Sequence, residues 1–274
     1  MFQTIKHLAK MLNMVFLYRH LQSAVMVPSW GLPWFRPRRR RLIALLAVRD
    51  GMRYLPGFLR NVAPQVDGII ALDDGSSDGS PELLAGHEAV IELLRNPPDR
   101  PEWDEVGNHR ALIKAALRHA ADWVICIDAD ERLEQHFRIR AERVIARGWW
   151  FGYSAYAIRL RELWEDPGQY RVDGIWGRKM MARLFRLRED HAFDDRPLHG
   201  LKAPLQARRG SGFPKADLTI YHLSMVKAED RQARRRRYEQ ADPDCRWQRI
   251  GYAYLTDSTG IILESLPRGR GFQM

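Results

Sequence analysis

The chain of 274 residues is poor in cysteine and contains no long apolar run. Its two cysteines, Cys126 and Cys245, are too few for a disulfide framework and are typical of a reducing compartment, so we expect a cytoplasmic protein. No stretch reaches the roughly 18 apolar residues that are needed to cross a bilayer, and no small-residue cleavage site follows an apolar segment. The sequence therefore predicts neither a secreted disulfide-rich domain nor a transmembrane helix.

Acidic residues are absent from positions 1–41, which carry eight lysines and arginines. The whole chain has a net charge of +10, so subtracting these eight leaves +2 for the remainder. The basic character therefore belongs to an N-terminal extension and says little about the body of the protein. Nothing resembles a DNA- or RNA-binding signature, and we expect no nucleic-acid partner.

The extension also holds Trp30, Trp34 and Phe35, just before its arginine run. Aromatic and cationic side chains in this combination favour the interface of an anionic membrane. We therefore predict a peripheral contact between residues 1–41 and the inner face of the membrane. An ordinary packed extension and a wrongly assigned start codon are the alternatives.

Residues 123–133 join a buried strand to a group of acids. The run at 123–127 is short and apolar, as expected for a strand that is covered on both faces of a parallel sheet. Asp128 and Asp130 follow at its carboxyl end, where open α/β sheets bind ligands. Alternation along an extended chain would place both carboxylates on one side. The sequence therefore predicts that the two share a divalent cation.

A second acidic strand end lies upstream. Residues 69–72 read as a buried strand, and Asp73 and Asp74 open a tight polar turn that ends at the predicted helix start, Ser80. Asp74 precedes Asp128 by 54 positions, which leaves room for a helix, a strand and a second helix. One sheet can therefore bring both acidic loops to the same edge.

The motifs DDGSSDGS and DADERL, in this order and after a strand that ends in Arg49 and Asp50, resemble those of glycosyltransferase family 2. The resemblance implies an α/β fold of the GT-A type, in which a Rossmann-like nucleotide-binding sheet is joined to a smaller α+β portion on the acceptor side. It places this domain at residues 42–242, between the basic extension 1–41 and a C-terminal tail at 243–274.

The same resemblance implies roles for the acids of both loops. Asp50, Asp73 and Asp74 would contact the nucleotide of a nucleotide diphosphate sugar. Asp128 would contact the ribose or a metal-bound water, and Asp130 would ligate Mn²⁺ or Mg²⁺. Family members often place a basic residue and an asparagine early in the next helix, where this chain has Leu112 and Ile113. Arg110 could reach the diphosphate instead, and a solvated helix arginine is the alternative.

A further departure concerns the acceptor side. The family often has a His-Glu pair where this chain has His199 and Gly200, so the glutamate that commonly serves as the base is missing. We take Asp195 and Asp194 as the candidates for the base, with Glu165 and Asp166 as alternatives.

His222 ends the strand-like run LTIYHL, where similar proteins often place a histidine near the metal or diphosphate. It is the third predicted metal ligand, and a structural histidine is the alternative. Trp164 and Trp176, flanked by acids, glycine and proline, are predicted to lie in loops and to stack on an acceptor. The arginines at 234–237 fit either a solvated helix face or binding of a diphosphate or lipid headgroup.

The leading hypothesis is metal-assisted, inverting transfer of a sugar to the hydroxyl of a carbohydrate or lipid-linked acceptor, in the assembly of a cell-envelope polysaccharide. Nucleotidyl transfer would require a Gly-rich basic signature after the first strand, and the sequence there, RDGMRYLP, does not supply it. An aspartyl phosphatase would require Thr or Val directly after Asp130, where this chain has Glu131. Twelve-residue calcium loops that begin at Asp73 or Asp74 do not end in glutamate. The non-enzymatic alternative is an inactive transferase-fold protein that binds a membrane or a polyanion.

Overall fold

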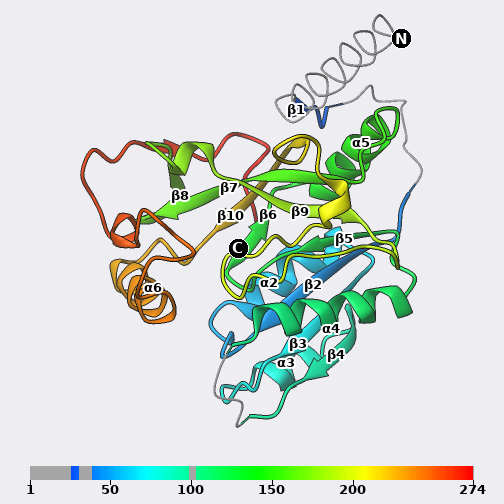
Figure 1. Ribbon diagram of the computed structural model, residues 1–274, viewed down its shortest axis with the longest axis horizontal. Coiled ribbons are helices and arrows are strands. Elements are labelled where there is room, and N and C mark those ends of the chain that lie inside the picture. The colour runs from blue at the N-terminus through cyan, green and yellow to red at the C-terminus, as the bar shows by residue number, and fades with distance from the viewer. Residues whose placement is uncertain (1–25, 31–38, 99–102, 274) are drawn as a thin grey trace, which may run out of the picture.

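The computed structural model describes residues 26–30, 39–98 and 103–273, and a mixed β-sheet lies at its centre (Figure 1). The strands follow the order β1-β10-β7-β9-β5-β2-β3-β4. In chain order these strands are β1 (Met26–Val27), β2 (Leu42–Val48), β3 (Gly68–Asp73), β4 (Val90–Arg95), β5 (Trp123–Cys126), β7 (Ala155–Trp164), β9 (Met180–Arg186) and β10 (Lys215–His222). Three short strands join at the side: β6 (Glu131–Leu133) pairs with β10, β8 (Asp166–Arg171) pairs with β7, and β11 (Leu263–Ser265) pairs with β8.

Helices cover both faces of the sheet. The α-helices among the described residues are α2 (Leu55–Val62), α3 (Ser80–Ala85), α4 (Glu105–Arg118), α5 (Phe137–Trp149) and α6 (Ala228–Ala241). Short 3₁₀ turns lie at η1 (Ala63–Gln65), η2 (Trp176–Arg178), η3 (Leu205–Ala207) and η4 (Ala253–Leu255). None of the described helices is long and apolar enough to span a bilayer.

The first half of the chain builds the parallel part of the sheet. β2 lies between β3 and β5 and is parallel to both, and β4 is parallel to β3. Leu42, Ala44 and Leu46 face a core cluster shared with α2, α3 and α5, whereas Ile43 and Leu45 face a second cluster shared with α4. This two-sided burial explains the continuous apolar runs in the sequence and confirms the predicted α/β class.

The second half of the chain adds a mixed portion. β9 is antiparallel to both β5 and β7, and β10 is parallel to β7 and antiparallel to β6. These pairings bring the end of β10, near His222, beside the loop that follows β5, because β6 belongs to that loop. The smaller α+β portion thus completes the edge at which the acidic loops lie.

Both flanks of the predicted domain contact the body. β1 pairs with β10 through Met26 and Lys215, and Arg270 forms ion pairs with Glu134 at 2.6 Å and with Asp217 at 2.7 Å. The domain boundaries after residues 41 and 242 stay predictions. Residues 1–25 and 31–38, on which most of the predicted membrane contact falls, lie outside the described residues.

The two tryptophans predicted for acceptor stacking are buried. Trp164 is the last residue of β7 and Trp176 begins η2, and their rings meet edge to face with centroids 5.7 Å apart. Their side chains are 0% and 3% exposed, and the guanidinium of Arg171 lies 4.5 Å from the ring centre of Trp164. The stacking prediction is wrong because both rings belong to a small core cluster and face no solvent.

Candidate active site

The carboxyl ends of β2, β3 and β5 meet at one edge of the sheet, as predicted. The loop after β2 is tied to the loop after β3 by backbone and serine groups. Asp50, held at φ +50°, accepts hydrogen bonds from the backbone N–H of Ser77 at 2.8 Å and from its hydroxyl at 3.2 Å. In return, the backbone N–H of Asp50 donates to the hydroxyl of Ser76 at 2.9 Å. The two loops therefore form one surface.

The first acidic loop holds its two leading carboxylates in different ways. Asp74 is fully buried and accepts hydrogen bonds from Arg49 at 2.7 Å and from the amide of Asn96. Asn96 also donates to the amide oxygen of Asn108 at 2.9 Å, so α4 is joined to this network. Asp73 accepts one bond from the backbone N–H of Ser76 at 3.3 Å. Its second oxygen, Oδ1, is buried and finds no hydrogen-bond partner among the described residues.

The loop after β5 contains Asp128, Ala129 and Asp130, and we call it the DxD loop. Its backbone forms a turn, so the alternation of side chains expected for an extended chain fails. β5 ends at Cys126, and the backbone N–H of Glu131 donates to the carbonyl of Asp128 at 2.9 Å. The guanidinium of Arg132 holds the turn by donating to the carbonyls of Ala129 and Tyr54, both at 2.9 Å. Because the backbone turns here, the two carboxylates bond to different partners, Asp128 to Arg183 and Asp130 to His222.

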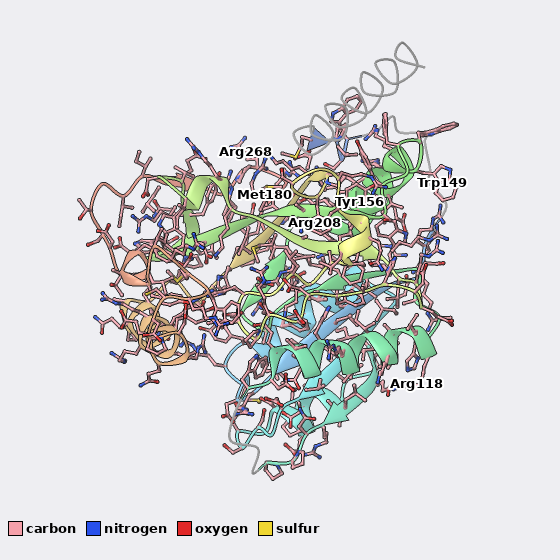
Figure 2. The ribbon with its side chains drawn as sticks, viewed as in Figure 1. Arg118, Trp149, Tyr156, Met180, Arg208 and Arg268 are labelled. Atoms are coloured by element: carbon pink, nitrogen blue, oxygen red, sulfur yellow. The ribbon has the colours of Figure 1, made fainter. Side chains whose placement is uncertain are left out.

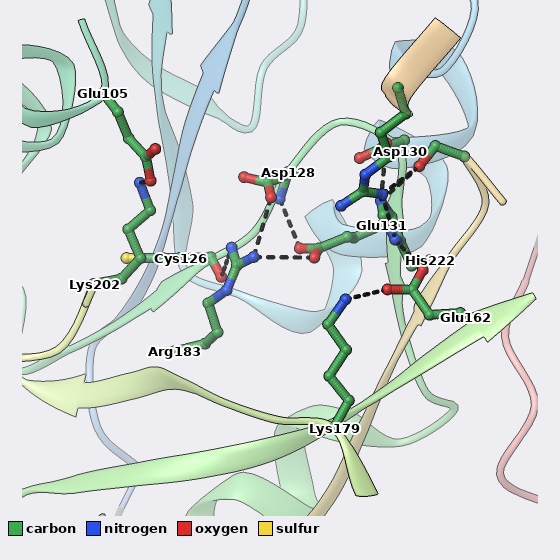
Figure 3. Close-up of polar contacts among 12 residues, drawn as sticks. Glu105, Cys126, Asp128, Asp130, Glu131, Glu162, Lys179, Arg183, Lys202 and His222 are labelled. Atoms are coloured by element: carbon green, nitrogen blue, oxygen red, sulfur yellow. Dashed lines mark hydrogen bonds and ion pairs between the residues drawn. The ribbon is translucent and has the colours of Figure 1, made fainter. Parts of the chain in front are cut away.

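Asp128 is paired with an arginine from β9 (Figure 3). Arg183 reaches Asp128 at 3.1 Å and Glu131 at 3.2 Å, and Glu131 also accepts from the backbone N–H of Asp128 at 2.9 Å. The Asp128 side chain is 51% exposed, whereas those of Arg183 and Glu131 are 7% and 1% exposed. Asp128 therefore presents a carboxylate at the surface of a buried charge cluster.

Asp130 is paired with a histidine from β10 (Figure 3). Nε2 of His222 lies 3.0 Å from Oδ2 of Asp130, and Nδ1 contacts Glu162, a fully buried residue of β7. Glu162 also forms an ion pair with Lys179. The chain of contacts Asp130, His222, Glu162 and Lys179 thus connects the turn after β5 to three other parts of the fold.

A second arginine lies against His222. Arg234 of α6 donates to the hydroxyl of Ser224 at 2.8 Å, and its Nη1 lies 3.1 Å from Nε2 of His222. The hydroxyl of Ser224 is 2.9 Å from the same His222 nitrogen. Lys202 lies on the other side of the cluster and is paired with Glu105 at 2.6 Å. Arginines and lysines therefore surround the DxD loop.

These contacts shift the pKa values of the buried groups. Burial lowers the pKa of His222, but Glu162 and Asp130 outweigh it and raise this pKa to about 10. Burial raises the pKa of Asp130, and the charge of His222 reverses the effect, so the pKa of Asp130 is lowered. The pKa of Glu131 is raised to about 7, chiefly by burial, although Arg183 opposes the shift. The imidazole of His222 is therefore charged at neutral pH in this arrangement, and it would have to release a proton in order to ligate a metal.

The donor set fits a metal that is shared with a ligand. Among the residues that the structure describes, no group of three or more His, Cys, Asp and Glu side chains is arranged to hold an ion. However, Nε2 of His222 faces Asp130 while Glu162 fixes its other nitrogen, which is the arrangement of a metal-binding histidine with an outer-shell carboxylate. Mg²⁺ sites commonly use one or two carboxylates and complete their coordination with phosphate oxygens and water.

The predicted base and diphosphate residues lie at the surface. Asp195 is exposed, whereas Asp194 is held within its own loop by Arg196 at 2.7 Å and by the backbone N–H of Leu201 at 3.0 Å. Arg110 is exposed on α4. The positions of these side chains do not test their predicted roles. The role of Asp195 or Asp194 as the base and the contact of Arg110 with the diphosphate therefore stay predictions.

The alternative bases lie at the β7–β8 turn. Glu165 has a φ of +62° and is exposed, and Asp166 accepts from the backbone N–H of Gly168 at 2.6 Å. Like Asp194 and Asp195, they stay predictions.

Sequence reasoning missed the partners of the acids. Arg183 and Glu162 lie on β9 and β7, and Lys179 directly precedes β9, and the sequence predicted no role for any of them. For Arg183 the available signal was its place as the one charged residue within the run MMARLF of β9, because a buried charge requires a partner. Asn96 and Asn108 gave no comparable signal.

An α/β sheet with acidic loops at its carboxyl edge is typical of nucleotide-binding proteins. Residues 51–141 match the family model described as glycosyl transferase family 2. This match agrees with the predicted family over residues 51–141, and the central sheet with helices on both faces confirms the predicted α/β class.

Sequence relatives cover much of this chain. A protein of Mycobacterium tuberculosis, described as uncharacterized, is 33% identical over 221 residues, which are 78% of this chain and 53% of that protein. A TPR repeat-containing protein of Synechococcus elongatus is 35% identical over 159 residues, which are 57% of this chain and 34% of that protein. The chain thus spans about half the length, or less, of the curated relatives that it matches.

Solved structures with a similar fold include TarS of S. aureus, at 11% identity and a TM-score of 0.48 over 74% of this chain and 40% of that chain. The mannosyltransferase PcManGT of Pyrobaculum calidifontis, solved with GDP-Man and Mn²⁺, has 16% identity and a TM-score of 0.44 over 92% of this chain and 80% of that chain. At these identities and TM-scores the likeness carries nothing about the substrate of this chain.

Proposed function

We propose that the protein transfers a sugar from a nucleotide diphosphate sugar to an acceptor hydroxyl, with Mn²⁺ or Mg²⁺ held by Asp130 and His222. The observation that carries this proposal is the meeting of the two acidic loops at one sheet edge, with Asp130 facing a histidine that Glu162 fixes from behind. The match of residues 51–141 to the glycosyl transferase family 2 model supports the reaction class.

The first loop would hold the nucleotide. Asp73 Oδ1 is a buried acceptor that has no partner among the described residues, and such an atom is costly unless a donor reaches it. An N–H group of a base or a hydroxyl of a ribose supplies a donor of this kind. Asp50 and Asp74 would shape the same surface through the contacts that join the loops.

The DxD loop would hold the diphosphate. Asp130 and His222 would ligate the ion, and the half-exposed Asp128 would contact it directly or through water. A bound divalent ion supplies positive charge that stabilises the departing diphosphate. Arg183 and Arg234 add fixed positive charge beside Asp128 and His222, which favours an anionic ligand over the exposed edge.

An inverting transfer also needs a base that removes the proton of the acceptor hydroxyl. Asp195 is the first candidate because its carboxylate is exposed, whereas the contacts of Asp194 with Arg196 and Leu201 hold it within its own loop. The acceptor would be a carbohydrate or lipid-linked hydroxyl, as in the assembly of a cell-envelope polysaccharide. The inactive-fold alternative is not favoured, because no observation at the site supports it.

Nucleotide-sugar hydrolysis tests the proposal without knowledge of the acceptor. UDP-, GDP- and dTDP-sugars are incubated with the protein and Mn²⁺, and the released diphosphate is measured. We expect hydrolysis with one nucleotide, and a loss of at least about a hundredfold in Asp130→Asn. Asp244→Asn, an exposed carboxylate outside the site, is the matched control. Absence of turnover and of nucleotide binding with every compound would contradict the proposal.

A further inference from the structure

α5 ends in three consecutive aromatic side chains that point away from the protein. Trp149 is 60% exposed, Trp150 is 86% exposed and Phe151 is 56% exposed. Trp149 lies at the outer edge of the molecule, at the end of α5 (Figure 2). Trp30, which follows β1, is also 65% exposed. Large aromatic side chains gathered on one exposed surface mark an interaction site, because single exposed ones are ordinary and clusters are not.

The exposure is fixed by the local fold. Gly148 packs against Tyr156 of β7 so closely that a Cβ atom there would lie 1.7 Å from the tyrosine oxygen. The turn closes at Gly152, whose φ is +67° and whose backbone N–H donates to the carbonyl of Trp149 at 3.0 Å. Because the last helical turn is anchored on β7, the rings at 149–151 cannot fold back into the core without losing these contacts.

Arginines surround the exposed rings. The guanidinium of Arg147 lies 4.8 Å from the ring centre of Trp30, and that of Arg40 lies 5.9 Å from the ring centre of Trp149. Arg209 donates to the carbonyl of Gly152 at 2.8 Å. A backbone carbonyl carries no net charge, so this bond does not neutralise the positive charge of Arg209.

A cavity continues this surface into the protein. It has a volume of about 530 Å³, and its lining includes Arg40, Arg186, Arg188, His191 and Trp149. Asp190 also lines it and is paired with Arg188 at 3.0 Å. We call the exposed rings Trp30, Trp149, Trp150 and Phe151, together with Arg40, Arg147, Arg186, Arg188 and Arg209, the aromatic–arginine face.

The aromatic–arginine face is separate from the candidate active site. Arg40 precedes β2, Trp123 of the cavity wall begins β5, and Arg186 ends β9 opposite Trp123. The face therefore lies at the amino ends of the central strands, whereas Asp128 follows their carboxyl ends. The four residues of β5 alone span about 10 Å between the two places.

We propose that the aromatic–arginine face docks on the surface of an anionic lipid bilayer. Tryptophan and phenylalanine side chains favour the headgroup region, and arginines are attracted to anionic headgroups. The cavity would take a phosphate-bearing headgroup between Arg40 and Arg186. Trp30 and Arg40 also belong to the predicted contact of residues 1–41, whereas the other residues of the face belong to the folded body, so the proposed surface reaches beyond that segment. It would leave the opposite edge of the sheet open to a donor from solution.

The charge distribution favours a bilayer over a protein partner. The three consecutive rings project from a single turn, and five arginines stand around them with Asp190 paired to one of these arginines. Such a combination of projecting rings and one dominant sign of charge fits a fluid anionic surface, which needs no shape complementarity. A protein partner would have to provide a matching concave and acidic surface.

Co-sedimentation with vesicles tests the proposal on the full chain. We expect binding to vesicles that contain phosphatidylglycerol, weaker binding at high salt, and little binding to phosphatidylcholine alone. The double variant Trp150→Ser with Phe151→Ser should lose at least about tenfold in partitioning while residues 1–41 remain intact. The matched control is Ile250→Ser with Ile262→Ser, which removes two exposed apolar side chains from another face.

A second pair of variants tests the charges. Arg186→Gln with Arg209→Gln should lower partitioning into anionic vesicles by roughly tenfold or more, since each cation near the surface contributes about fivefold. The control is Arg249→Gln with Arg268→Gln, two exposed arginines elsewhere (Arg268 is labelled in Figure 2). Thermal unfolding of all variants should match the parent, because the altered side chains lie at the surface.

Three results would overturn the proposal. The parent protein could remain in the supernatant with anionic vesicles at low salt. Both double variants could bind as tightly as the parent, which would assign binding to another region such as residues 1–41. Alternatively, light scattering could show a dimer of the parent that the Trp150 and Phe151 variant abolishes without any vesicle binding, and the face would then be an interface between two copies of the chain.

Discussion

The two acidic loops at the edge of the sheet satisfy their carboxylates in different ways. In the loop after β3, Asp74 is bonded to Arg49 and Asn96, which lie 25 and 22 positions away. In the loop after β5, Asp128 is paired with Arg183 and Asp130 with His222, at separations of 55 and 92 positions. The first loop thus draws on neighbouring strands of the parallel half, and the second draws on the mixed half.

This difference suggests a division of roles. The loop after β3 is built by one half of the chain and leaves one buried acceptor, Asp73 Oδ1, without a partner among the described residues. The loop after β5 is surrounded by cations from the other half, and its acids are already paired with them. A neutral donor group of a nucleotide suits the first loop, whereas a diphosphate with its metal suits the second.

The largest effect on stability should come from Arg183. Arg183→Gln leaves Glu131 and Asp128 without their counter-charge, and removal of one partner from a buried pair typically costs about 3–5 kcal/mol of unfolding free energy. Arg49→Gln should cost less, about 1.5–3 kcal/mol, because Asp74 keeps its bond with Asn96. Urea unfolding of both variants measures the difference. Equal losses would show that the two loops depend on their arginines to the same extent.

The proposed base, Asp195, lies outside both loops, so its removal should separate turnover from donor binding. Asp195→Asn should lower the transfer rate about a hundredfold or more while nucleotide affinity stays at the parent value, because a general base acts on the acceptor. Steady-state transfer and nucleotide titration give the two quantities. Asp194→Asn, Glu165→Gln and Asp166→Asn are measured in parallel. Loss of turnover in one of these alone would move the role to that residue.

A smaller effect is expected from the residue that fixes His222. Glu162→Gln should weaken Mn²⁺ affinity by about 10–100-fold, since outer-shell carboxylates orient a ligating histidine. Glu92→Gln is the matched control, because Glu92 contacts His119 at 2.9 Å in a pair outside the site. Titration of Mn²⁺ by calorimetry measures the affinities, and circular dichroism checks the fold. Unchanged affinity in a folded Glu162→Gln protein would exclude this positioning role.

Much of the parallel half could be predicted from the sequence. The strand at 42–48, the acidic turn at 73–79 and the strand that begins at Trp123 are marked by local patterns, because a strand buried on both faces must be apolar throughout. The meeting of the two acidic loops followed from chain order and sheet topology. These features depend on contacts between neighbouring βαβ units.

The partners of the DxD loop could not be predicted in the same way. The alternation argument assumed an extended backbone at Asp128 and Asp130, and the turn that Arg132 holds replaces it. The pairing with Arg183 and His222 depends on how β9 and β10 join the sheet, which no local pattern specifies. For the same reason Trp176, in a segment rich in turn residues, was expected in a loop although it is buried.

Nucleotide affinity with and without Mn²⁺ tests the division of roles most directly. Dissociation constants for UDP, GDP and dTDP are measured by calorimetry for the parent, Asp73→Ala and Asp130→Asn. We predict that Asp73→Ala weakens binding but keeps its dependence on Mn²⁺, whereas Asp130→Asn binds the nucleotide equally with and without Mn²⁺. The account is contradicted if Asp130→Asn keeps the full metal dependence, or if Asp73→Ala binds the nucleotide as tightly as the parent.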